Sequence, residues 1–500
     1  MRVLMKRASY AKDGFRRSKR DTSDYLFPVY FVLGVLCVLG LVMTLVPSRS
    51  VPGTESEGGP EHILVFDCGS TGTRLNIIRN EGGTLVPVDW QEFDVPWEGY
   101  KAKKHGYHRL ETLGGIHGLA GKDLEAVKGA LQPMLDWAGA ALSSRKPSEI
   151  PILLFATAGV RKLSKGGQDA LMRHVRHVLS STNFKFQEEW AKIITGEDEG
   201  IFSWVSSNYK LGNFERTVAS SSDRGSPGMS MNMLELGGSS LQVSYVVDAP
   251  AETARTVEVL GRDYNLQVKS FNGYGMNDAF NSTLTHLRKR WDGGKGGERK
   301  SRIAHPCLQK GYTLKEADVS FDGDFDAEEC ERVIEAATHS EVVQRYAKSM
   351  RNAKTRFIAL AGFYLVYSFF DLDLKKPLSE VVKHANAVCE QSYDSSLSRE
   401  QREDLNSGLY CFRSTYILAI SRWLSISDQD IKVFDSSEWA LGAGIQYLAF
   451  LMPRHEGWKV GWLLGVSGIL LLAGLVVGGW ARKGRSANGL LPVFFSDKHP

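Results

Sequence analysis

Two distant segments of this chain share one pattern of residue types. Val65–Gly72 runs from apolar residues through Asp67 to glycine and hydroxyl residues, and Met233–Ser240 repeats that order with Glu235 as its acid. The pattern predicts a strand that ends in a tight loop, where glycine lets backbone N–H groups approach an anion closely. Two such loops, each led by a carboxylate, predict duplicated halves that hold one phosphate chain and its metal from opposite sides. This arrangement indicates chemistry on nucleotides.

Both loops supply groups that bind phosphate oxygens. Hydroxyls and backbone amides come from Ser70–Arg74 in the first loop and from Gly237–Ser240 in the second. The first loop lacks a Gly-Lys-Ser/Thr ending and is therefore not a P-loop; taken alone, it is better explained as a tight β-turn. Asp67 and Glu235, at strand ends that face across a cleft, suit a hydrated divalent cation, since Mg²⁺ keeps several waters and uses few protein carboxylates.

Two further segments carry candidate groups. Phe155–Arg161 is a predicted strand that runs into a turn of small residues around Gly159. Thr157 could donate to the nucleophile or to phosphate there, and Arg161 is either a phosphate clamp or half of a structural salt bridge. Gly196–Gly200 encloses three acids at the start of a helix. The helix dipole is the usual explanation for such acids, but the two flanking glycines predict crowding of the backbone.

The length, net charge and apolar stretches of the chain limit its possible partners and its membrane topology. The 500 residues are too many for one core and predict at least two lobes. A formal charge of +4 gives no argument for a nucleic-acid partner. Leu26–Val46 and Gly461–Trp480 are apolar stretches of about 20 residues, enough to span a bilayer as helices. Basic residues on their outer flanks predict cytosolic termini and a luminal or extracellular middle; a cleaved signal peptide is the alternative for the first stretch.

The cysteines fit an oxidising compartment. Cys307 with Cys330, and Cys389 with Cys411, form near pairs that favour disulfides, although four cysteines permit three pairings. No C-x-x-C or histidine pair has the spacing of a zinc site. Asn281-Ser282-Thr283 is the only N-glycosylation sequon and predicts a glycan on Asn281.

The hydrophobic pattern predicts alternating strands and helices, an α/β chain with mixed sheets. Ile63–Asp67 and Ile152–Ala156 have the length and apolar character of strands. Leu124–Leu142 and Gly167–Ser180 repeat apolar residues at steps of three and four and are predicted helices. Phe357–Phe370, strongly apolar and aromatic, is also predicted as a helix.

In their order along the chain, these motifs resemble the signature regions of the apyrase family, the ecto-nucleoside triphosphate diphosphohydrolases. The matching segments are Asp67–Arg74, Ala156–Arg161, Gly196–Tyr209, Glu235–Gln242 and Ser437–Gly442. The likeness covers roughly residues 63–455. The apolar stretches at both ends resemble those of doubly anchored members, and the loops resemble those of plant apyrases.

The resemblance implies a two-lobed α/β fold of the actin, Hsp70 and sugar-kinase type (RNase H-like), with the active site between the lobes and two added transmembrane helices. The implied division is a basic cytosolic tail (1–24), a span (25–46), a linker (47–60), lobe I (61–190 and 430–456), lobe II (191–429), a second span (460–480) and a cytosolic tail (481–500).

The resemblance also implies a role for each site residue. Glu199 would be the general base that takes a proton from the attacking water, and Thr157 would help to position that water. Asp67 and Glu235 would hold hydrated Ca²⁺ or Mg²⁺. Tyr364 would stack on the nucleobase, with core packing as the equal alternative. The phosphate-binding residues would be Ser70, Thr71, Gly72, Thr73, Arg74, Gly159, Arg161, Gly237, Gly238, Ser239, Ser240 and Gln242.

The expected activity is hydrolysis of nucleoside tri- or diphosphates on the luminal or extracellular face of the Golgi or plasma membrane. Many relatives have aspartate where Glu235 stands, which could alter the metal preference. One alternative is another enzyme of the same fold, such as a kinase or exopolyphosphatase, although these lack Gly-x-x-Glu-Gly. The other is a non-catalytic nucleotide-binding glycoprotein. The small-residue pair Gly474 and Gly478 in the second span predicts close helix packing, either with the first span or in a homo-oligomer.

Overall fold

The structure is a computed structural model that describes residues 59–82, 84–88, 92–93, 110–214, 230–247, 253–292, 302–350, 356–404, 406–435 and 439–451. Both predicted spans, both tails and most of the linker lie outside these residues, as do Ser437 and Glu438 of the last motif. Within the described ranges, no helix combines the length and the apolar character that a membrane crossing requires.

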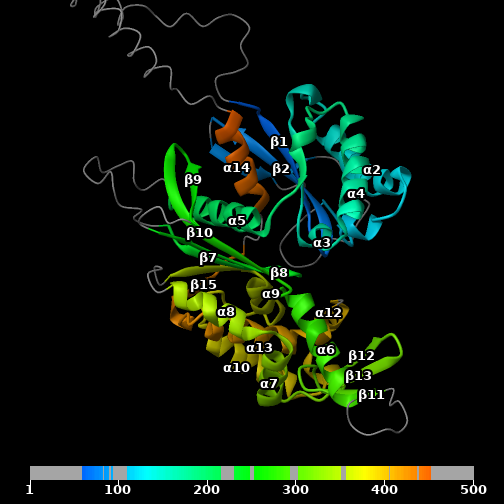
Figure 1. Ribbon diagram of the computed structural model, residues 1–500, viewed down its shortest axis with the longest axis vertical. Helices are drawn as coiled ribbons and strands as arrows, with labels where there is room; N and C mark the ends of the chain where they lie inside the picture. The colour runs from blue at the N-terminus through cyan, green and yellow to red at the C-terminus, as the bar shows by residue number, and fades with distance from the viewer. Residues whose placement is uncertain are drawn as a thin grey trace, which may run out of the picture. The chain divides into compact units, whose positions relative to one another are not determined.

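The first lobe is built on a six-stranded sheet that contains both predicted strands, Ile63–Asp67 and Ile152–Ala156 (Figure 1). Its strands run in the order β3-β2-β1-β5-β6, with β4 also paired to β2. They are β1 (His62–Cys68), β2 (Gly72–Glu81), β3 (Thr84–Val88), β4 (Leu110–Leu113), β5 (Ile152–Ala156) and β6 (Ala191–Ile193). β1 pairs with β2 in antiparallel fashion and with β5 in parallel fashion.

The second lobe repeats that arrangement. Its main sheet has the order β15-β14-β7-β8-β10-β9. The strands are β7 (Asn232–Leu236), β8 (Ser240–Val246), β9 (Arg255–Val259), β10 (Arg262–Asn272), β14 (Phe357–Ala361) and β15 (Ile431–Val433). β7 pairs with β8 in antiparallel fashion and with β14 in parallel fashion. The duplication expected from the two loops is therefore confirmed at the level of strand topology.

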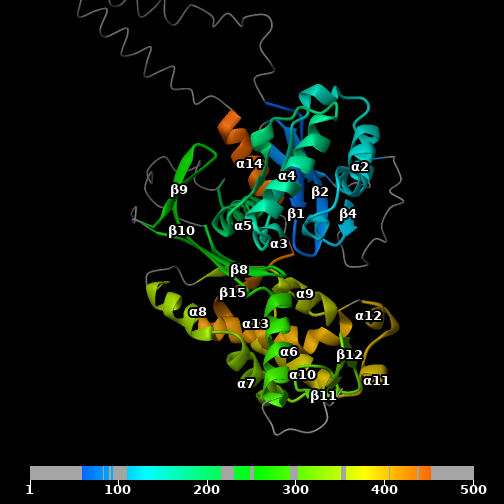
Figure 2. The ribbon, with the colours of Figure 1, turned by 45° about the vertical axis from the view of Figure 1, so that its right-hand side comes forward.

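Two helices lie between the sheets and share one core with both. α5 (Gly196–Lys210) and α14 (Trp439–Leu451) pack against each other in Figures 1 and 2. Their cluster joins Ile63 and Val65 of β1 with Met233 of β7. The alternate residues of β1, such as Leu64 and Phe66, face a separate cluster. β1 is thus buried on both faces, which explains its uninterrupted apolar run.

Helices cover the remaining faces. α2 (Leu124–Ala141) and α4 (Lys165–Ser180) pack on the first sheet through that separate cluster, close to the bounds that periodicity predicts. The second lobe carries more helices and a small sheet of order β11-β13-β12. These elements are α6 (Met276–Asp292), α7 (Ala327–Ala337), α8 (Ser340–Ala347), α9 (Gly362–Phe369), α10 (Leu378–Cys389), α11 (Tyr393–Ser396), α12 (Arg399–Glu403), α13 (Tyr410–Trp423), β11 (Arg302–His305), β12 (Thr313–Glu316) and β13 (Val319–Gly323).

The prediction of one helix over Phe357–Phe370 is wrong in its first part. The segment forms the central strand β14 and then the short helix α9, which is labelled in Figure 2. β14 lies between β7 and β15 and is almost fully buried, so its apolar run has no polar positions to reveal a strand period. The chain turns at Ala361, where φ is +55°. A Cβ on Gly362 would lie 2.9 Å from the Leu236 carbonyl oxygen, so the strand-to-helix turn requires glycine there.

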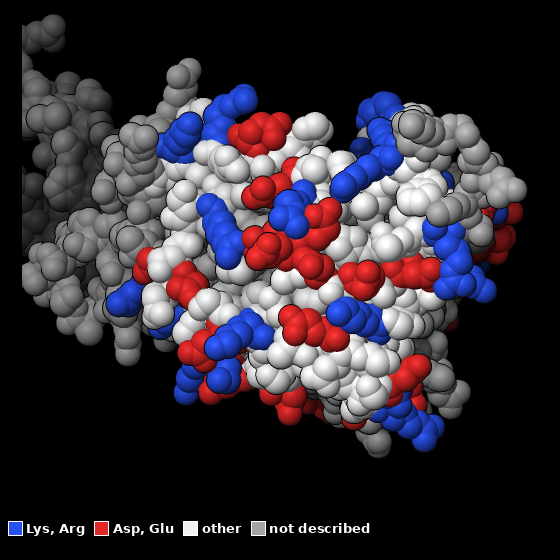
Figure 3. All heavy atoms as spheres, turned by 90° about the horizontal axis from the view of Figure 1, so that it is seen from below, with Lys and Arg blue, Asp and Glu red and all other residues white. Residues whose placement is uncertain are grey.

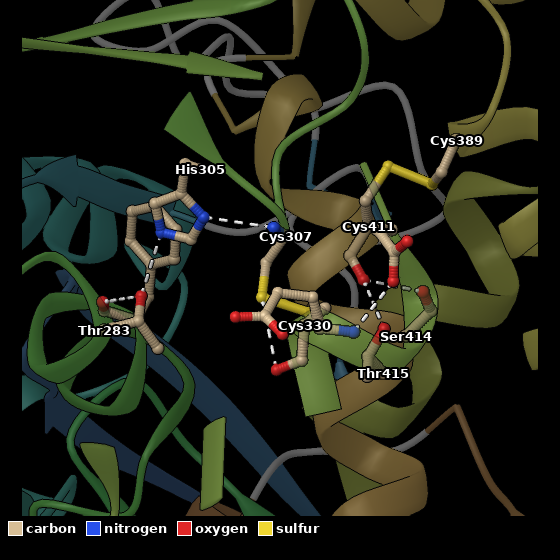
Figure 4. The surroundings of a disulfide bond; sticks show 11 residues. Thr283, His305, Cys307, Cys330, Cys389, Cys411, Ser414 and Thr415 are labelled. Carbon is tan, nitrogen blue, oxygen red and sulfur yellow. Dashed lines mark hydrogen bonds between the residues drawn. A yellow bond between two sulfur atoms is a disulfide. The ribbon is translucent and has the colours of Figure 1, made fainter. Parts of the chain in front are cut away.

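Both preferred disulfides are present. Cys307 joins Cys330 of α7, and Cys389 of α10 joins Cys411 of α13 (Figure 4). Beside the first bond, the His305 ring accepts a hydrogen bond from the Cys307 N–H (3.1 Å), and its other nitrogen lies 3.1 Å from the Thr283 hydroxyl. Burial lowers the pKa of His305 to about 3, so this histidine is a neutral structural residue.

Charges on the outer face of the second lobe are mixed in sign. Figure 3 shows acidic and basic side chains interspersed on the face seen from below. Ion pairs such as Arg422–Glu331 (2.8 Å) and Arg332–Glu329 (2.7 Å) belong to this lobe. The described residues on this face therefore form no continuous basic surface of the kind that binds nucleic acid.

Candidate active site

The two predicted phosphate loops have the same local structure. In the first, the Gly69 N–H donates to the Gly72 carbonyl (2.9 Å); in the second, the Gly237 N–H donates to the Ser240 carbonyl (3.0 Å). The loops also meet, because a Cβ on Gly238 would lie 2.9 Å from Ser70 Oγ. Strands from two different sheets therefore bring the loops together, as the sequence predicts.

Each loop is covered by a glycine that the sequence analysis missed. A Cβ on Gly115 would lie 2.1 Å from the Gly69 carbonyl oxygen, and one on Gly275 would lie 2.2 Å from the Ser239 nitrogen. Gly115 follows β4 and Gly275 follows β10. The segment that packs against each loop therefore comes directly after another strand of the same sheet.

The carboxylate of the first loop is paired within its own hairpin. Arg74 Nη1 donates to Asp67 Oδ2 (3.1 Å), and Nη2 donates to Thr71 Oγ1 (3.4 Å). Asp67 and Arg74 face each other because they are partners in the β1–β2 register. Thr73 is fully buried, whereas Ser70 is partly exposed and Thr71 is exposed. The loop therefore presents two hydroxyls and one arginine, which already has an acidic partner.

The three acids at the start of α5 have three different environments. Asp198 completes a capping box with Thr195 and pairs with Arg255 (2.5 Å). Glu197 accepts a hydrogen bond from the Ser270 N–H (3.4 Å). Glu199 alone is buried, with 8% of its surface exposed. The dipole and capping explanation thus fits Asp198, and it does not account for the burial of Glu199.

The crowding predicted from the flanking glycines is confirmed. A Cβ on Gly196 would lie 2.0 Å from Ser270 Oγ, and one on Gly200 would lie 2.8 Å from Val268 Cγ1. The two glycines let the first turn of α5 lie against β10. This contact holds Glu199 close to β8 and β10.

Glu199 lies between the Arg161 guanidinium and the side-chain amide of Gln242. Arg161 Nη2 donates to Glu199 Oε2 (3.0 Å), and Arg161 Nη1 donates to the Ile194 carbonyl (3.1 Å). On the other side, Gln242 Nε2 lies 3.5 Å from the same carboxylate oxygen. Gln242 is fully buried, yet its Oε1 has no hydrogen-bond partner among the described residues. An unpaired buried acceptor beside a carboxylate is a place where a water molecule would be held.

Burial and neighbouring carboxylates raise the pKa values of two acids of the site, Glu199 and Glu235. Burial raises the pKa of Glu199 to about 7, an effect that Arg161 opposes and Asp67 adds to. Burial and the Glu199 charge raise the pKa of Glu235 well above its usual value. Ser203 Oγ donates a hydrogen bond to Glu235 Oε2 and favours the charged form. Ser203 is a further residue that sequence reasoning missed.

The acid cluster fits a hydrated divalent cation. Asp67, Glu199 and Glu235 interact unfavourably, and a cation near Asp67 and Glu235 would relieve that repulsion. No group of three or more acid, histidine or cysteine side chains in the described ranges is arranged to bind a metal directly. The oxygen-only donors at the loops are those that Mg²⁺ and Ca²⁺ prefer.

The Thr157 turn lies against the first loop. Thr157 precedes the short helix α3 (Ala158–Arg161), is 3% exposed, and its Oγ1 donates to the Cys68 carbonyl (3.4 Å). A Cβ on Gly159 would lie 3.1 Å from Ser70 Cα and 2.7 Å from His117 Nδ1. The turn therefore adjoins the phosphate loop, while the role of Thr157 in positioning water stays a prediction. His117, beside both, was not anticipated from the sequence.

Two predicted residues lie on helices of the second lobe. Tyr364, on α9, is partly buried and packs against the large core cluster. Asn281 is exposed on α6, whereas Thr283 of the same sequon is fully buried. The stacking role of Tyr364 and the glycan on Asn281 stay predictions.

The repeated half-sheets, with two helices between them and two loops that meet, define a two-lobed α/β protein of the actin-like class. A solved nucleoside triphosphate hydrolase from Neospora caninum shares this fold, with a TM-score of 0.55 and 16% identity over 80% of this chain and 94% of that one. The profile of the GDA1/CD39 (nucleoside phosphatase) family matches residues 55–456. The chain belongs to this family.

Similar proteins carry the name apyrase. "Probable apyrase 7" of Arabidopsis thaliana is 26% identical over 83% of this chain, which spans 60% of that relative's length. "Probable apyrase 4" of the same plant is 29% identical over 88% of this chain and 89% of its own length. "Ectonucleoside triphosphate diphosphohydrolase 1" of Mus musculus is 25% identical over 90% of each chain. Family membership favours a phosphatase over the kinase and exopolyphosphatase alternatives.

Proposed function

We propose that this protein hydrolyses the terminal phosphoanhydride bond of nucleoside tri- and diphosphates. The observation that carries the proposal is the setting of Glu199: a buried carboxylate with a pKa of about 7, between the Arg161 guanidinium and the side-chain amide of the buried Gln242. A general base is most effective when its pKa lies near the working pH. The adjoining loops supply the phosphate contacts.

The site would act by direct attack of water. Glu199 removes one proton from the water as its oxygen bonds to the terminal phosphorus, and the side-chain amide of Gln242, which contacts Glu199, helps to position that water. The bond from phosphorus to the bridging oxygen breaks, which releases inorganic phosphate and the shortened nucleotide. Loop groups such as Ser70 and Ser239 hold the phosphate oxygens, and Arg161 neutralises part of the charge that develops.

A divalent cation is part of the proposal, as enzymes of this family depend on one. Asp67 and Glu235 would hold it through its waters, as Ca²⁺ or Mg²⁺. When bound, it supplies charge neutralisation for the phosphate chain. The longer side chain at Glu235, fixed by Ser203, is the feature of this chain that would set the metal preference.

The cellular setting is likewise proposed. The two apolar segments at 25–46 and 460–480 would anchor the protein with both termini in the cytosol, and the two disulfides fit a luminal or extracellular catalytic part. The membrane would be that of the Golgi or the cell surface, and the spans would provide the contact for a homo-oligomer. Reaction of Cys389 and Cys411 with a thiol reagent only after reduction, in sealed vesicles, tests the disulfide side of this proposal.

The test of activity uses the full chain with its disulfides intact. Phosphate release is measured from ATP, ADP, UDP and GDP with Ca²⁺, Mg²⁺ or EDTA. Glu199→Gln is expected to abolish release and to leave nucleotide binding measurable. Glu197→Gln is the matched control, because it removes the same charge from the same helical turn. The Glu197 carboxylate accepts from the Ser270 N–H instead of from Arg161 and Gln242. Equal activity in Glu199→Gln would sink the assignment, and binding without release by the native enzyme would favour a nucleotide-binding protein.

A further inference from the structure

One cation of the first lobe reaches the second phosphate loop. Lys162 directly follows α3, and its Nζ donates to Ser239 Oγ (2.8 Å) and to Asp278 Oδ2 (2.5 Å). Ser239 Oγ in turn donates to Asp278 Oδ1 (3.3 Å). Lys162, Ser239 and Asp278 thus form a closed triangle that links the two lobes.

The acidic partner of Lys162 is fixed to the second loop. Asp278 is in the first turn of α6, whose N–H groups bind the loop's carbonyl oxygens: Met276 donates to Gly237 (2.9 Å) and Asn277 to Gly238 (2.9 Å). These contacts use the carbonyl side of the loop. Asp278 therefore holds the Lys162 ammonium at the edge of the second loop.

The lysine is also close to the first loop. It follows the turn whose Gly159 lies against Ser70. Its charge is felt by His117, whose pKa is lowered mainly by burial and further by Lys162. Because the two loops meet at Gly238 and Ser70, the ammonium lies near their junction.

Lys162 differs from the two arginines of the site in its freedom to move. The side chains of Arg74 and Arg161 are 18% and 16% exposed, and each holds an acid of the site. The Lys162 side chain is 49% exposed. An ammonium on a flexible stem is a compact point charge that can change partners, whereas a planar guanidinium fits one geometry. A nucleotide brings several negative charges to this junction, and Lys162 is the cation best placed to turn toward them.

We propose that Lys162 is a phosphate-binding residue that exchanges partners. Without nucleotide, Asp278 and Ser239 hold its ammonium; with nucleotide, the ammonium pairs with the phosphate chain and leaves the Ser239 hydroxyl to donate to phosphate as well. Asp278 is then a competitor of the substrate for Lys162. This inference rests on the proposed function, since it concerns the same loops.

A fixed structural bridge between the lobes would behave differently. If the Lys162–Asp278 pair served only to hold the lobes, removing either partner would break the same contact and weaken nucleotide binding alike. If Lys162 exchanges, the two removals act in opposite directions: loss of Lys162 removes a phosphate contact, and loss of the Asp278 charge removes a competitor.

The experiment compares Lys162→Met, Asp278→Asn and the double variant in the full chain. It measures kcat and KM for ATP and ADP, and the affinity for a non-hydrolysable ATP analogue with Mg²⁺. We expect Lys162→Met to weaken analogue binding about tenfold or more, the loss of one charge-assisted hydrogen bond. Asp278→Asn should strengthen binding, and the double variant should match Lys162→Met. Lys165→Met is the control, because Lys165 forms an exposed pair with Asp169 on α4; it should change nothing.

Several results would overturn the exchange. These are equal weakening by Lys162→Met and Asp278→Asn, unchanged binding in Lys162→Met, or no binding of the analogue to the native protein. If Lys162→Met fails to fold, Asp278→Asn alone decides by the sign of its effect. The proposed function fails separately, when the native protein binds the analogue but releases phosphate from no nucleotide.

Discussion

At the scale of single residues, side chains of the same type in this site differ in burial and in hydrogen-bond partners. Glu197, Asp198 and Glu199 are consecutive acids in one helical turn, yet only Glu199 is buried against a cation. Its carboxylate is costly to ionise there, and Arg161 offsets that cost in part. The pair therefore holds a base whose proton affinity is far above that of an exposed glutamate.

This pairing predicts the pH dependence of catalysis. Below the pKa of about 7 the Glu199 carboxyl holds a proton and cannot accept another. We expect kcat/KM to rise with pH up to about 7 and to level off above it. In Arg161→Met the opposing charge is gone, so the pKa of Glu199 rises further and the whole profile moves to higher pH.

The measurement is the kcat/KM profile of the native enzyme and of Arg161→Met with one nucleotide. The substrate's own titration is the same for both enzymes and cancels in the comparison. Arg255→Met is the control, because Arg255 pairs with Asp198 instead. A shift of the Arg161→Met profile to lower pH contradicts the assignment.

A second prediction at this scale concerns Ser203. Its hydroxyl favours the charged form of the buried Glu235. Ser203→Ala should raise the pKa of Glu235, so that less of the carboxylate is available to a cation, and the half-saturating Mg²⁺ concentration should rise about fivefold, the value of one hydrogen bond.

Titration of activity with Mg²⁺ measures that effect. Ser207→Ala is the matched control, since Ser207 is a buried serine of the same helix whose hydroxyl donates to the Ser203 carbonyl (2.8 Å). Equal metal requirement in Ser203→Ala and the native enzyme would falsify a role for Ser203 in holding Glu235.

At the scale of elements, strands were predicted where the burial pattern is simple. β1 and β5 were placed almost residue for residue, because each is a short apolar run followed by glycine and hydroxyl residues. The same reasoning misassigned Phe357–Ala361, since a strand buried on both faces has no period and is followed directly by an apolar helix.

The site divides in the same way. The loops, Glu199 and Gln242 lie in short motifs. The residue types within each motif were therefore enough to predict them as site residues. Gly115, Gly275, Lys162 and Ser203 act on segments far away in the chain. Nothing in their own neighbourhoods shows which loop they contact, so only the folded arrangement identifies them.

The glycine at the end of β10 gives a prediction at this scale. A Cβ on Gly275 would come within 2.4 Å of the backbone of Gly238 and Ser240, so Gly275→Ala must displace the second loop. We expect a loss of about 1–3 kcal/mol of stability and a large fall in kcat/KM.

Thermal unfolding and steady-state kinetics measure both effects. Gly139→Ala in α2 is the control: no atom lies within 4 Å of its added Cβ, and alanine favours the helix by up to about 1 kcal/mol. Native-like activity in Gly275→Ala would show that the second loop tolerates displacement.

At the scale of the whole molecule, one hydrophobic core of the described residues joins the lobes, whereas the large cluster on the outer side of each sheet belongs to one lobe alone. α5 lies in the shared core and carries Glu199 at its first turn. The proposed base therefore lies in the region between the sheets, whereas the loops lie at the ends of strands of the sheets themselves. The Lys162 contact adds a polar link between the same two lobes.

The disulfides give a prediction for the whole fold. The two bonds close loops of nearly equal length, with sequence separations of 23 and 22. Removing either pair, as Cys307→Ser with Cys330→Ser or Cys389→Ser with Cys411→Ser, should lower the free energy of unfolding by a similar amount, about 2–4 kcal/mol. Thermal unfolding with and without reductant measures this; a native midpoint unaffected by reductant contradicts it.

The burial of Thr283 has a consequence for biosynthesis. An enzyme that attaches a glycan to Asn281 must read the threonine two residues later, and in the folded protein that threonine is fully enclosed beside His305. The sequon is accessible to that enzyme only before α6 packs against the small sheet. The fraction of molecules that carry a glycan at Asn281 would then depend on two rates. It would compare how fast this part of the second lobe folds with how fast the nascent chain passes the enzyme that attaches the glycan.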